Sequence, residues 1–248
     1  MSAIRSYHRP ATLDEALDLL TRPDAVSVVL GGGTVVTTRT DVEPFEVVDL
    51  QDLGLTAITT GPGAATIGAM ALLQDVVDHQ DLPPLLGELA RREAPSTIRN
   101  AATVGGTIAA ADPESELLAG LLVHETMVTL HDRRHAELLP LPTLLADPGA
   151  IAGRIITEVT VAIGGETSSH RTGRTPADRP IVAVAGRLHN GVLHLAATGV
   201  ATAPVLISID KLDRLAPPGD FRGSPQYRRR LVEVLAGRVI ADLEGAPA

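Results

Sequence analysis

The chain alternates short apolar runs, typical of β-strands, with segments in which apolar residues recur at helical spacing. The runs that predict strands lie at residues 26–30, 45–50, 65–69 and 154–163, with a hairpin over 127–138. Helical spacing predicts helices over residues 72–77, 85–92 and 116–122. Thr12 and Glu15 form a capping box ahead of a further leucine-rich helix, which Pro23 ends. The first two thirds of the chain therefore predict an α+β fold.

The last third predicts a small antiparallel sheet followed by a helix. Segments 181–188 and 192–198 flank Asn190-Gly191, a strong hairpin signal, and residues 205–209 supply a third strand. Residues 225–243 predict an amphipathic helix with its arginines, including the run 228–230, on the wet face or at a subunit contact. The residues expected on its apolar face are Tyr227, Leu231, Val234, Leu235 and Val239. The polar, glycine-rich stretch 164–169 predicts a hinge between domains.

Two stretches are poor in side chains and rich in glycine. Gly31-Gly32-Gly33-Thr34 follows a predicted strand directly, and Thr103-Val104-Gly105-Gly106-Thr107 precedes several small residues. Bare backbone N–H groups in such loops can approach an anionic ligand closely. We expect the two stretches to share one extended anionic ligand, with a flexible turn as the alternative for Gly31–Thr34. Neither matches a standard P-loop or GxGxxG motif.

The amino-acid composition excludes several kinds of cofactor and binding partner. The 248 residues include no cysteine, so the chain itself can hold neither a disulfide nor an iron–sulfur cluster. A formal charge of -9 argues against nonspecific nucleic-acid binding. No apolar run approaches the ~20 residues of a membrane span, and we expect a cytoplasmic location. His131 and His135 flank a predicted hairpin tip, which disfavours a metal site, and no catalytic side chain is predicted.

A series of short motifs, spread over nearly the whole chain, carries a family resemblance. The first three are Arg9 to Leu17, Gly31 to Thr34 and Val48-Asp49-Leu50. The others are Ile67-Gly68-Ala69, Ile98 to Gly106, Arg174 to Asp178 and Gly223 to Arg229. In this order they resemble the FAD-binding (medium) subunit of molybdenum hydroxylases such as carbon monoxide dehydrogenase and xanthine dehydrogenase. The Ile98–Gly106 element is the most specific of them.

The resemblance implies a fold and a role. It implies an FAD-binding domain of the PCMH type over residues 1–165, in two subdomains divided near residue 60. It implies a C-terminal domain over 170–248, with a three-stranded antiparallel sheet and helices. The expected function is electron transfer through FAD, from molybdenum-cofactor and iron–sulfur partner subunits to an acceptor such as NAD, oxygen or a quinone. The expected partners are therefore those large and small subunits.

The resemblance also implies site residues. Those that would cradle the FAD pyrophosphate are Gly31, Gly32, Gly33, Thr34, Val35 and Val36. Those that would bind its second side, through backbone N–H groups and the Thr103 hydroxyl, are Thr103, Gly105, Gly106 and Thr107. Asp112 and Glu116 correspond to polar ligands, Ile156 to the strand beside the isoalloxazine, and His170 or Arg171 to a lysine near the flavin. For Glu116, a charge in the first turn of a helix is an equally good interpretation. For Arg99-Asn100, anchoring of the loop is favoured over contact with the ligand.

The chain departs from the family pattern at several of these positions. Val35 replaces a polar residue, Thr107 replaces Asn or Asp, and Glu116 replaces Asp. One lost hydrogen bond is worth about 0.5–1.5 kcal/mol, so several would weaken FAD binding. The alternative function is a stand-alone enzyme or binding protein on the same scaffold. We expect Gly105→Val or Gly106→Val to abolish FAD binding and leave the fold largely intact.

Overall fold

The computed structural model describes residues 4–36, 43–175 and 178–245 of the chain. Its first sheet is three-stranded and parallel, in the order β1-β3-β2. The strands are β1 Ile4–His8, β2 Ser27–Leu30 and β3 Phe45–Asp49, and helix α1 Leu13–Leu20 packs beside them. Thr12 caps α1 by accepting the Glu15 amide at 3.3 Å, as the capping box predicts. The short helical turn η2 Gln51–Leu53 follows β3.

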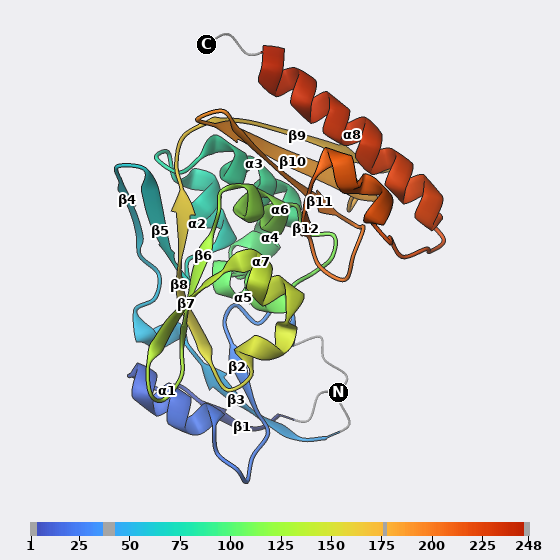
Figure 1. Cartoon of the computed structure of the whole chain (residues 1–248). Coiled ribbons are helices and arrows are strands. Elements are labelled where there is room, and N and C mark those ends of the chain that lie inside the picture. Colours follow the sequence, from blue (N-terminus) through green and yellow to red (C-terminus); the bar gives the residue numbers. More distant parts are fainter. Residues whose placement is uncertain (1–3, 37–42, 176–177, 246–248) are drawn as a thin grey trace.

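The second sheet has five antiparallel strands in the order β4-β5-β8-β6-β7 (Figure 1). The strands are β4 Ile58–Gly61, β5 Ala64–Gly68, β6 Met127–His131, β7 Ala136–Pro140 and β8 Ile155–Ala162. The first helices that join them are α2 Leu73–Asp78, α3 Pro84–Glu93 and α4 Ser96–Arg99. The others are α5 Val104–Ala110, α6 Glu116–Val123, α7 Leu141–Ala146 and the turn η3 Pro148–Ile151.

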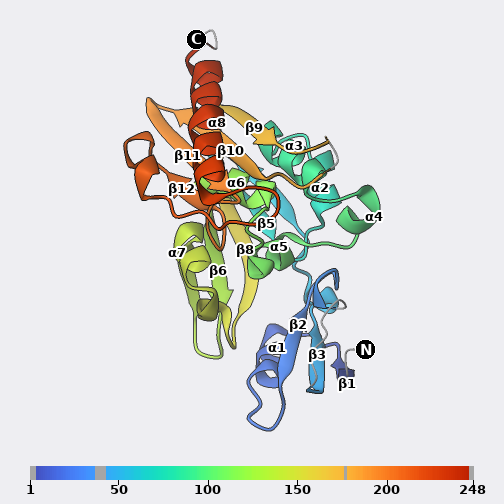
Figure 2. The ribbon, with the colours of Figure 1, turned by 90° about the vertical axis from the view of Figure 1, so that its right-hand side faces the viewer.

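The third sheet is antiparallel, with four strands in the order β12-β11-β10-β9. The strands are β9 Glu166–Thr172, β10 Val182–His189, β11 Val192–Thr198 and β12 Val205–Ile207. The turn η4 Ile209–Arg214 follows, and the long helix α8 Pro225–Gly245 covers the outer side of the sheet (Figures 1 and 2). Asn190 and Gly191 have φ of 51° and 77°, as a tight hairpin turn requires.

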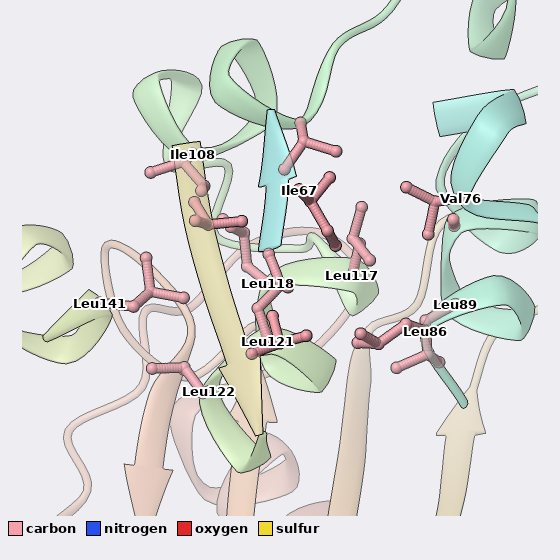
Figure 3. Packing of buried hydrophobic residues seen from close by; sticks show 14 of the residues in the cluster. Ile67, Val76, Leu86, Leu89, Ile108, Leu117, Leu118, Leu121, Leu122 and Leu141 are labelled. Carbon is pink, nitrogen blue, oxygen red and sulfur yellow. The ribbon is translucent and has the colours of Figure 1, made fainter. Parts of the chain in front are cut away.

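Helix α6 connects the second and third sheets. Every residue from Glu116 to Val123 is buried, because α6 packs against α3 on one side and β10 and β11 on the other. Figure 3 shows Leu117 and Leu121 of α6 among the surrounding apolar side chains. The largest core cluster joins α6 to Ala185 and Ala196 of the third sheet. The fold class is confirmed, and the division into 1–165 and 170–248 remains our proposal.

Two sequence predictions need correction. The stretch predicted as a hinge supplies β9, because only Gly164 and Gly165 turn the chain, with φ of 88° and 85°. The C-terminal sheet therefore has one strand more than expected. On α8, Tyr227 and Val234 are 44% and 38% exposed, although the pattern predicts them on the inward face. Arg228 is 2% exposed and lies between α8 and the third sheet. A polar strand and a buried arginine both depend on partners distant in sequence, which periodicity does not reveal.

Some elements were not predicted from the sequence. They are β4, α4, α5 and α7, all short. Residues 176–177, which belong to the motif Arg174–Asp178, lie outside the described part of the chain. Among the described residues, no helix combines the length and the apolar character needed to cross a membrane.

Candidate functional site

The first glycine-rich stretch begins where β2 ends. Gly33 has φ of 75°, a left-handed conformation that favours glycine. Among the described residues, the structure records no acceptor for the amides of Gly31, Gly32 and Thr34. Val36 is partly buried and Val35 is 54% exposed. The amides of Gly31, Gly32 and Thr34 are therefore available as donors, and their contact with a ligand remains a proposal.

The second glycine-rich stretch is the first turn of α5, with Thr103 as its N-cap. The Thr103 hydroxyl accepts the Gly106 amide at 3.1 Å, and the Thr103 carbonyl accepts the Thr107 amide at 2.9 Å. The amides of Val104 and Gly105 donate to the carbonyls of Ala71 and Ala69 at 3.0 and 2.8 Å. The donors expected to meet a ligand here are thus engaged within the chain. Contact of Thr103, Gly105, Gly106 and Thr107 with FAD remains a proposal.

The two stretches lie against each other, and the missing side chains make this possible. A Cβ on Gly32 would lie 1.6 Å from the carbonyl oxygen of Ala101, and one on Gly31 would lie 2.8 Å from the Thr103 Oγ1 atom. Thr103 is 2% exposed, so its hydroxyl lies inside this junction. We call the contact of Gly31 and Gly32 with Ala101 and Thr103 the loop junction. The glycines thus allow the two loops to pack closely, and a role in ligand approach remains a proposal.

Gly105 and Gly106 differ as positions for a test of FAD binding. A Cβ on Gly105 would lie 2.8 Å from the Ala69 Cβ and 2.9 Å from its carbonyl oxygen, within the buried core. A Cβ on Gly106, which is exposed, would meet only the Thr103 hydroxyl, at 2.9 Å. The expectation that Gly105→Val leaves the fold largely intact is therefore wrong, and Gly106 is the position to test.

Asp112, Ile156 and His170 are spread over separate surroundings. Asp112 accepts the Glu114 amide at 2.8 Å and pairs with Arg179 at 3.0 Å. Ile156 is 8% exposed in the core beside β6. The His170 Nε2 lies 2.8 Å from Asp242 on α8. The structure thus brings none of the three into the loop junction.

Glu116 lies in a buried ion cluster. Its side chain is 3% exposed, with Oε1 3.2 Å from the Arg171 Nε atom and Oε2 3.5 Å from the Arg92 Nη1 atom. Alternate residues of β9 point to opposite faces. Ser168 and His170 contact Asp242 of α8, whereas Ser169 and Arg171 face Arg92 and Glu116. Strand alternation therefore places His170 and Arg171 on opposite faces of the sheet, with Arg171 rather than His170 beside Glu116.

Burial raises the pKa of Glu116, and the guanidinium groups of Arg171 and Arg92 only partly oppose this. Burial likewise raises the pKa of Glu93, which accepts the Leu117 amide at 3.2 Å. A raised carboxyl pKa in the folded state means that stability is greatest with the group protonated and falls as pH rises through the folded pKa. Glu116 thus costs stability at neutral pH, although it lies between two arginines.

We expect Glu116→Gln to lose less stability than wild type as pH rises above 4.5, the ordinary pKa of a glutamate side chain, because burial raises the pKa of Glu116 in the folded state. The measurement is urea unfolding at several pH values, with the exposed change Glu244→Gln as control. Parallel pH profiles for wild type and Glu116→Gln would contradict the assigned pKa direction.

Arg99 and Asn100 anchor the loop that precedes Thr103. Arg99 donates to the carbonyls of Ala94 and Arg91 at 2.7 and 3.1 Å, and Asn100 donates to the Ser96 carbonyl at 2.7 Å. Of the two alternatives left open by the sequence, these contacts favour anchoring. The anchored loop carries Ala101, which forms one side of the loop junction.

Thr103→Val is expected to weaken both the fold and FAD binding. The change keeps the side-chain shape but removes the cap of α5, which costs about 1 kcal/mol. Because FAD binding then has to restore the first turn of α5, the affinity for FAD falls about fivefold. Thermal unfolding and FAD titration check the two effects. Thr103→Ser keeps the hydroxyl and should restore both, and an unchanged Thr103→Val protein would contradict the role of the cap.

Comparisons with known proteins agree with this architecture. A family model described as the FAD binding domain in molybdopterin dehydrogenase matches residues 2–162. The uncharacterized protein YgfM of Escherichia coli K12 is 30% identical over 262 residues, with 98% of each chain covered. The putative xanthine dehydrogenase FAD-binding subunit XdhB of the same strain is 25% identical over 283 residues, covering 97% of this chain and 96% of that protein.

Solved structures share the fold. A chain of carbon monoxide dehydrogenase from Hydrogenophaga pseudoflava superposes with a TM-score of 0.88 at 20% identity, covering 100% of both chains. At this identity the likeness concerns the fold alone. It includes the C-terminal sheet and α8, which lie beyond the residues that the family model matches.

Proposed function

The chain belongs to the FAD-binding domain family of molybdopterin dehydrogenases, and on this premise we propose that it is an electron-transfer subunit that passes electrons to an external acceptor. FAD is the cofactor of this family, whose members are subunits of FAD-dependent oxidoreductases. The electrons would come from molybdenum-cofactor and iron–sulfur partner subunits and would leave to an acceptor such as NAD, oxygen or a quinone. A cytoplasmic location remains part of the proposal.

The residues present fit FAD. The pyrophosphate of FAD is anionic and needs donors on a backbone that it can approach closely. Gly31, Gly32 and Thr34 have amides without an acceptor among the described residues, and the loop junction holds this stretch against Thr103. The free amides of the first loop are the observation that carries the proposal. We assign Gly33, Val35 and Val36 to the same cradle, and the start of α5 to its opposite side.

Bound FAD would supply the redox chemistry of the electron transfer. The protein binds the cofactor, orients it and holds charged groups nearby. Arg171, Arg92 and Glu116 form the charged group that we propose to face the flavin end of the site. No side chain needs to act as acid or base.

The relatives and the composition support the proposal of partner subunits. The relative XdhB is named as the FAD-binding subunit of a putative xanthine dehydrogenase, which supports a comparable place for this chain beside a molybdenum-cofactor subunit. The sequence contains no cysteine, so the iron–sulfur clusters of such an assembly would lie on another chain.

Affinity purification of the tagged chain from its native cells, followed by FAD, iron and molybdenum analysis, tests the assignment to a complex. We expect all three in a constant ratio in one complex. Recovery of the chain alone, with neither metal, would contradict the proposal and support the stand-alone alternative.

A further inference from the structure

A shallow groove lies on the outer side of the C-terminal domain, far along the chain from the loop junction. Residues of helix α8 and of η4 line it. Figure 1 shows the orange η4 segment beside the red helix α8. The volume of the groove is about 490 Å³. It is lined by Ile209, Asp210, Leu212, Asp213, Glu233, Gly237 and Ile240. We call this surface the α8 groove.

The lining of the α8 groove is mainly apolar. Leu212 is 7% exposed and belongs to the domain core, and Ile240 packs against the same core. Ile209 leaves 47% of its surface exposed. An apolar surface of this kind gains free energy when another apolar surface covers it.

Gly237 is an unusual residue for its place. It lies in the middle of α8, where glycine destabilises a helix by roughly 0.5–1 kcal/mol relative to alanine. No described heavy atom outside its own stretch of helix lies within 4 Å of a Cβ built there, so packing within the chain does not require glycine. Its absent side chain leaves the α8 groove open midway along the helix. A second backbone or side chain can therefore approach α8 closely at this point.

The rim of the α8 groove is acidic. Asp210 and Asp213 line it from η4, and Glu233 lines it from α8. Glu233 pairs with the exposed Arg230 at 2.6 Å, whereas the Asp213 carboxylate has no recorded partner among the described residues. Lys211 and Arg214 belong to η4 but do not line the groove. The charge facing an occupant is thus negative.

We propose that the α8 groove docks a cationic amphipathic segment of a partner protein chain, with apolar side chains against Ile209 and Gly237 and Arg or Lys beside Asp213 and Glu233. Charge complementarity selects this occupant, because an acidic rim around an apolar floor matches basic residues that flank an apolar face. The inference rests on the proposed function, in which the chain works beside partner subunits.

A second copy of this chain is a poorer match. Its densest basic run is Arg228–Arg230, and two of these arginines are engaged within the chain. Arg228 donates to the carbonyls of Ile181 and Gly199, and Arg229 donates to the Leu215 carbonyl at 2.7 Å. Only Arg230 of the run is largely exposed, at 73% of its side chain.

The probe is a synthetic helix of about 18 residues, long enough to be partly helical in water, with leucine and one tryptophan on one face and flanking arginines. The chain has no tryptophan, so the emission of the mixture reports the peptide alone. We expect a saturable blue shift with the full-length protein. A peptide of the same composition in scrambled order should bind at least about tenfold more weakly.

Single substitutions test whether the peptide binds at the α8 groove. Asp213→Lys and Gly237→Gln should each weaken peptide binding by at least about tenfold. Asp81→Lys, which makes the same change of net charge at an exposed turn between α2 and α3, should leave it unchanged. Equal binding by all these variants, or equal binding of the scrambled peptide, would overturn the proposal. So would self-association of the wild-type chain that Asp213→Lys abolishes, because the occupant would then be a second copy.

FAD titration of the same variants separates this proposal from the proposed function. Asp213→Lys should bind FAD as wild type does. Failure of the wild-type chain to bind FAD would contradict the proposed function and leave the peptide result standing. Loss of FAD binding in Asp213→Lys, with wild-type thermal unfolding, would instead show that the α8 groove belongs to the cofactor site and overturn the docking proposal.

Discussion

Gly32→Ala is expected to reduce the affinity of the chain for FAD by at least about 100-fold, corresponding to ~2.7 kcal/mol. The added Cβ would lie 1.6 Å from the Ala101 carbonyl oxygen and 2.4 Å from its carbonyl carbon. A backbone group cannot rotate away as a flexible side chain can, so the two loops have to separate. Separation moves the free amides of the first loop away from the start of α5. The single methyl group of alanine would thus disrupt the loop geometry that we propose for FAD binding.

FAD titration, followed by quenching of flavin fluorescence, measures this effect. Gly61→Ala is the matched control, because its added Cβ would make only an ordinary contact, 3.8 Å from the Ala64 carbonyl oxygen. The control should bind FAD as wild type does. Wild-type affinity in Gly32→Ala would show that the loop junction does not determine FAD binding.

Arg228→Met is expected to have the largest effect on stability, at least about 2 kcal/mol. Arg228 is 2% exposed and donates to the carbonyls of Ile181 and Gly199, both at 2.8 Å. It also pairs with Asp220 at 2.7 Å. Each buried acceptor left without a donor costs about 1–3 kcal/mol, and methionine offers none. Because the Gly199 amide donates to the Pro113 carbonyl at 2.7 Å, the change also loosens the contact between the C-terminal and FAD-binding parts.

Urea unfolding gives the free-energy difference, and Arg230→Met provides the comparison two residues along the same helix. Arg230 is 73% exposed, and its ion pair with Glu233 should contribute no more than about 1 kcal/mol. We therefore expect the Arg230 variant to lie close to wild type. Equal losses from the two substitutions would contradict the structural role assigned to Arg228.

The contrast between Arg228 and Arg230 shows what the hydrophobic periodicity of α8 predicts and what it does not. The pattern predicts α8 and its general orientation, and Leu235 and Val239 are buried as expected. It places the arginines on the wet side, because a buried arginine becomes favourable only when distant acceptors surround it. Arg228 finds those acceptors at Ile181 and Gly199, which belong to the strand region of the C-terminal sheet. Nothing in the local pattern indicates them.

The glycine-rich stretches likewise show that sequence alone predicts only part of the site. Both are visible in the sequence, and their resemblance to a cofactor-binding family indicates one shared ligand. The sequence does not show that Thr103 begins a helix, since glycines at its second and third positions lower helix propensity. Nor does it show that Gly32 packs on Ala101. The capping hydroxyl and the amide acceptors on Ala69 and Ala71 stabilise this turn, and they depend on β5 and the loop after it.

The choice between His170 and Arg171 could have been made from sequence if β9 had been predicted. Strand alternation places neighbouring residues on opposite faces, so only one of the two can face α6. The polar residues of this segment and the two glycines before it predict a hinge instead. The segment forms a strand because β10 pairs with it along seven residues, from Val182–Thr172 to Leu188–Glu166.

Titration of the purified, full-length chain with FAD tests the central claim most directly. We predict saturable binding of one FAD per chain, a visible flavin spectrum that persists through gel filtration, and loss of both in Gly32→Ala but not in Gly61→Ala. A colourless chain that takes up no FAD on titration would contradict the account.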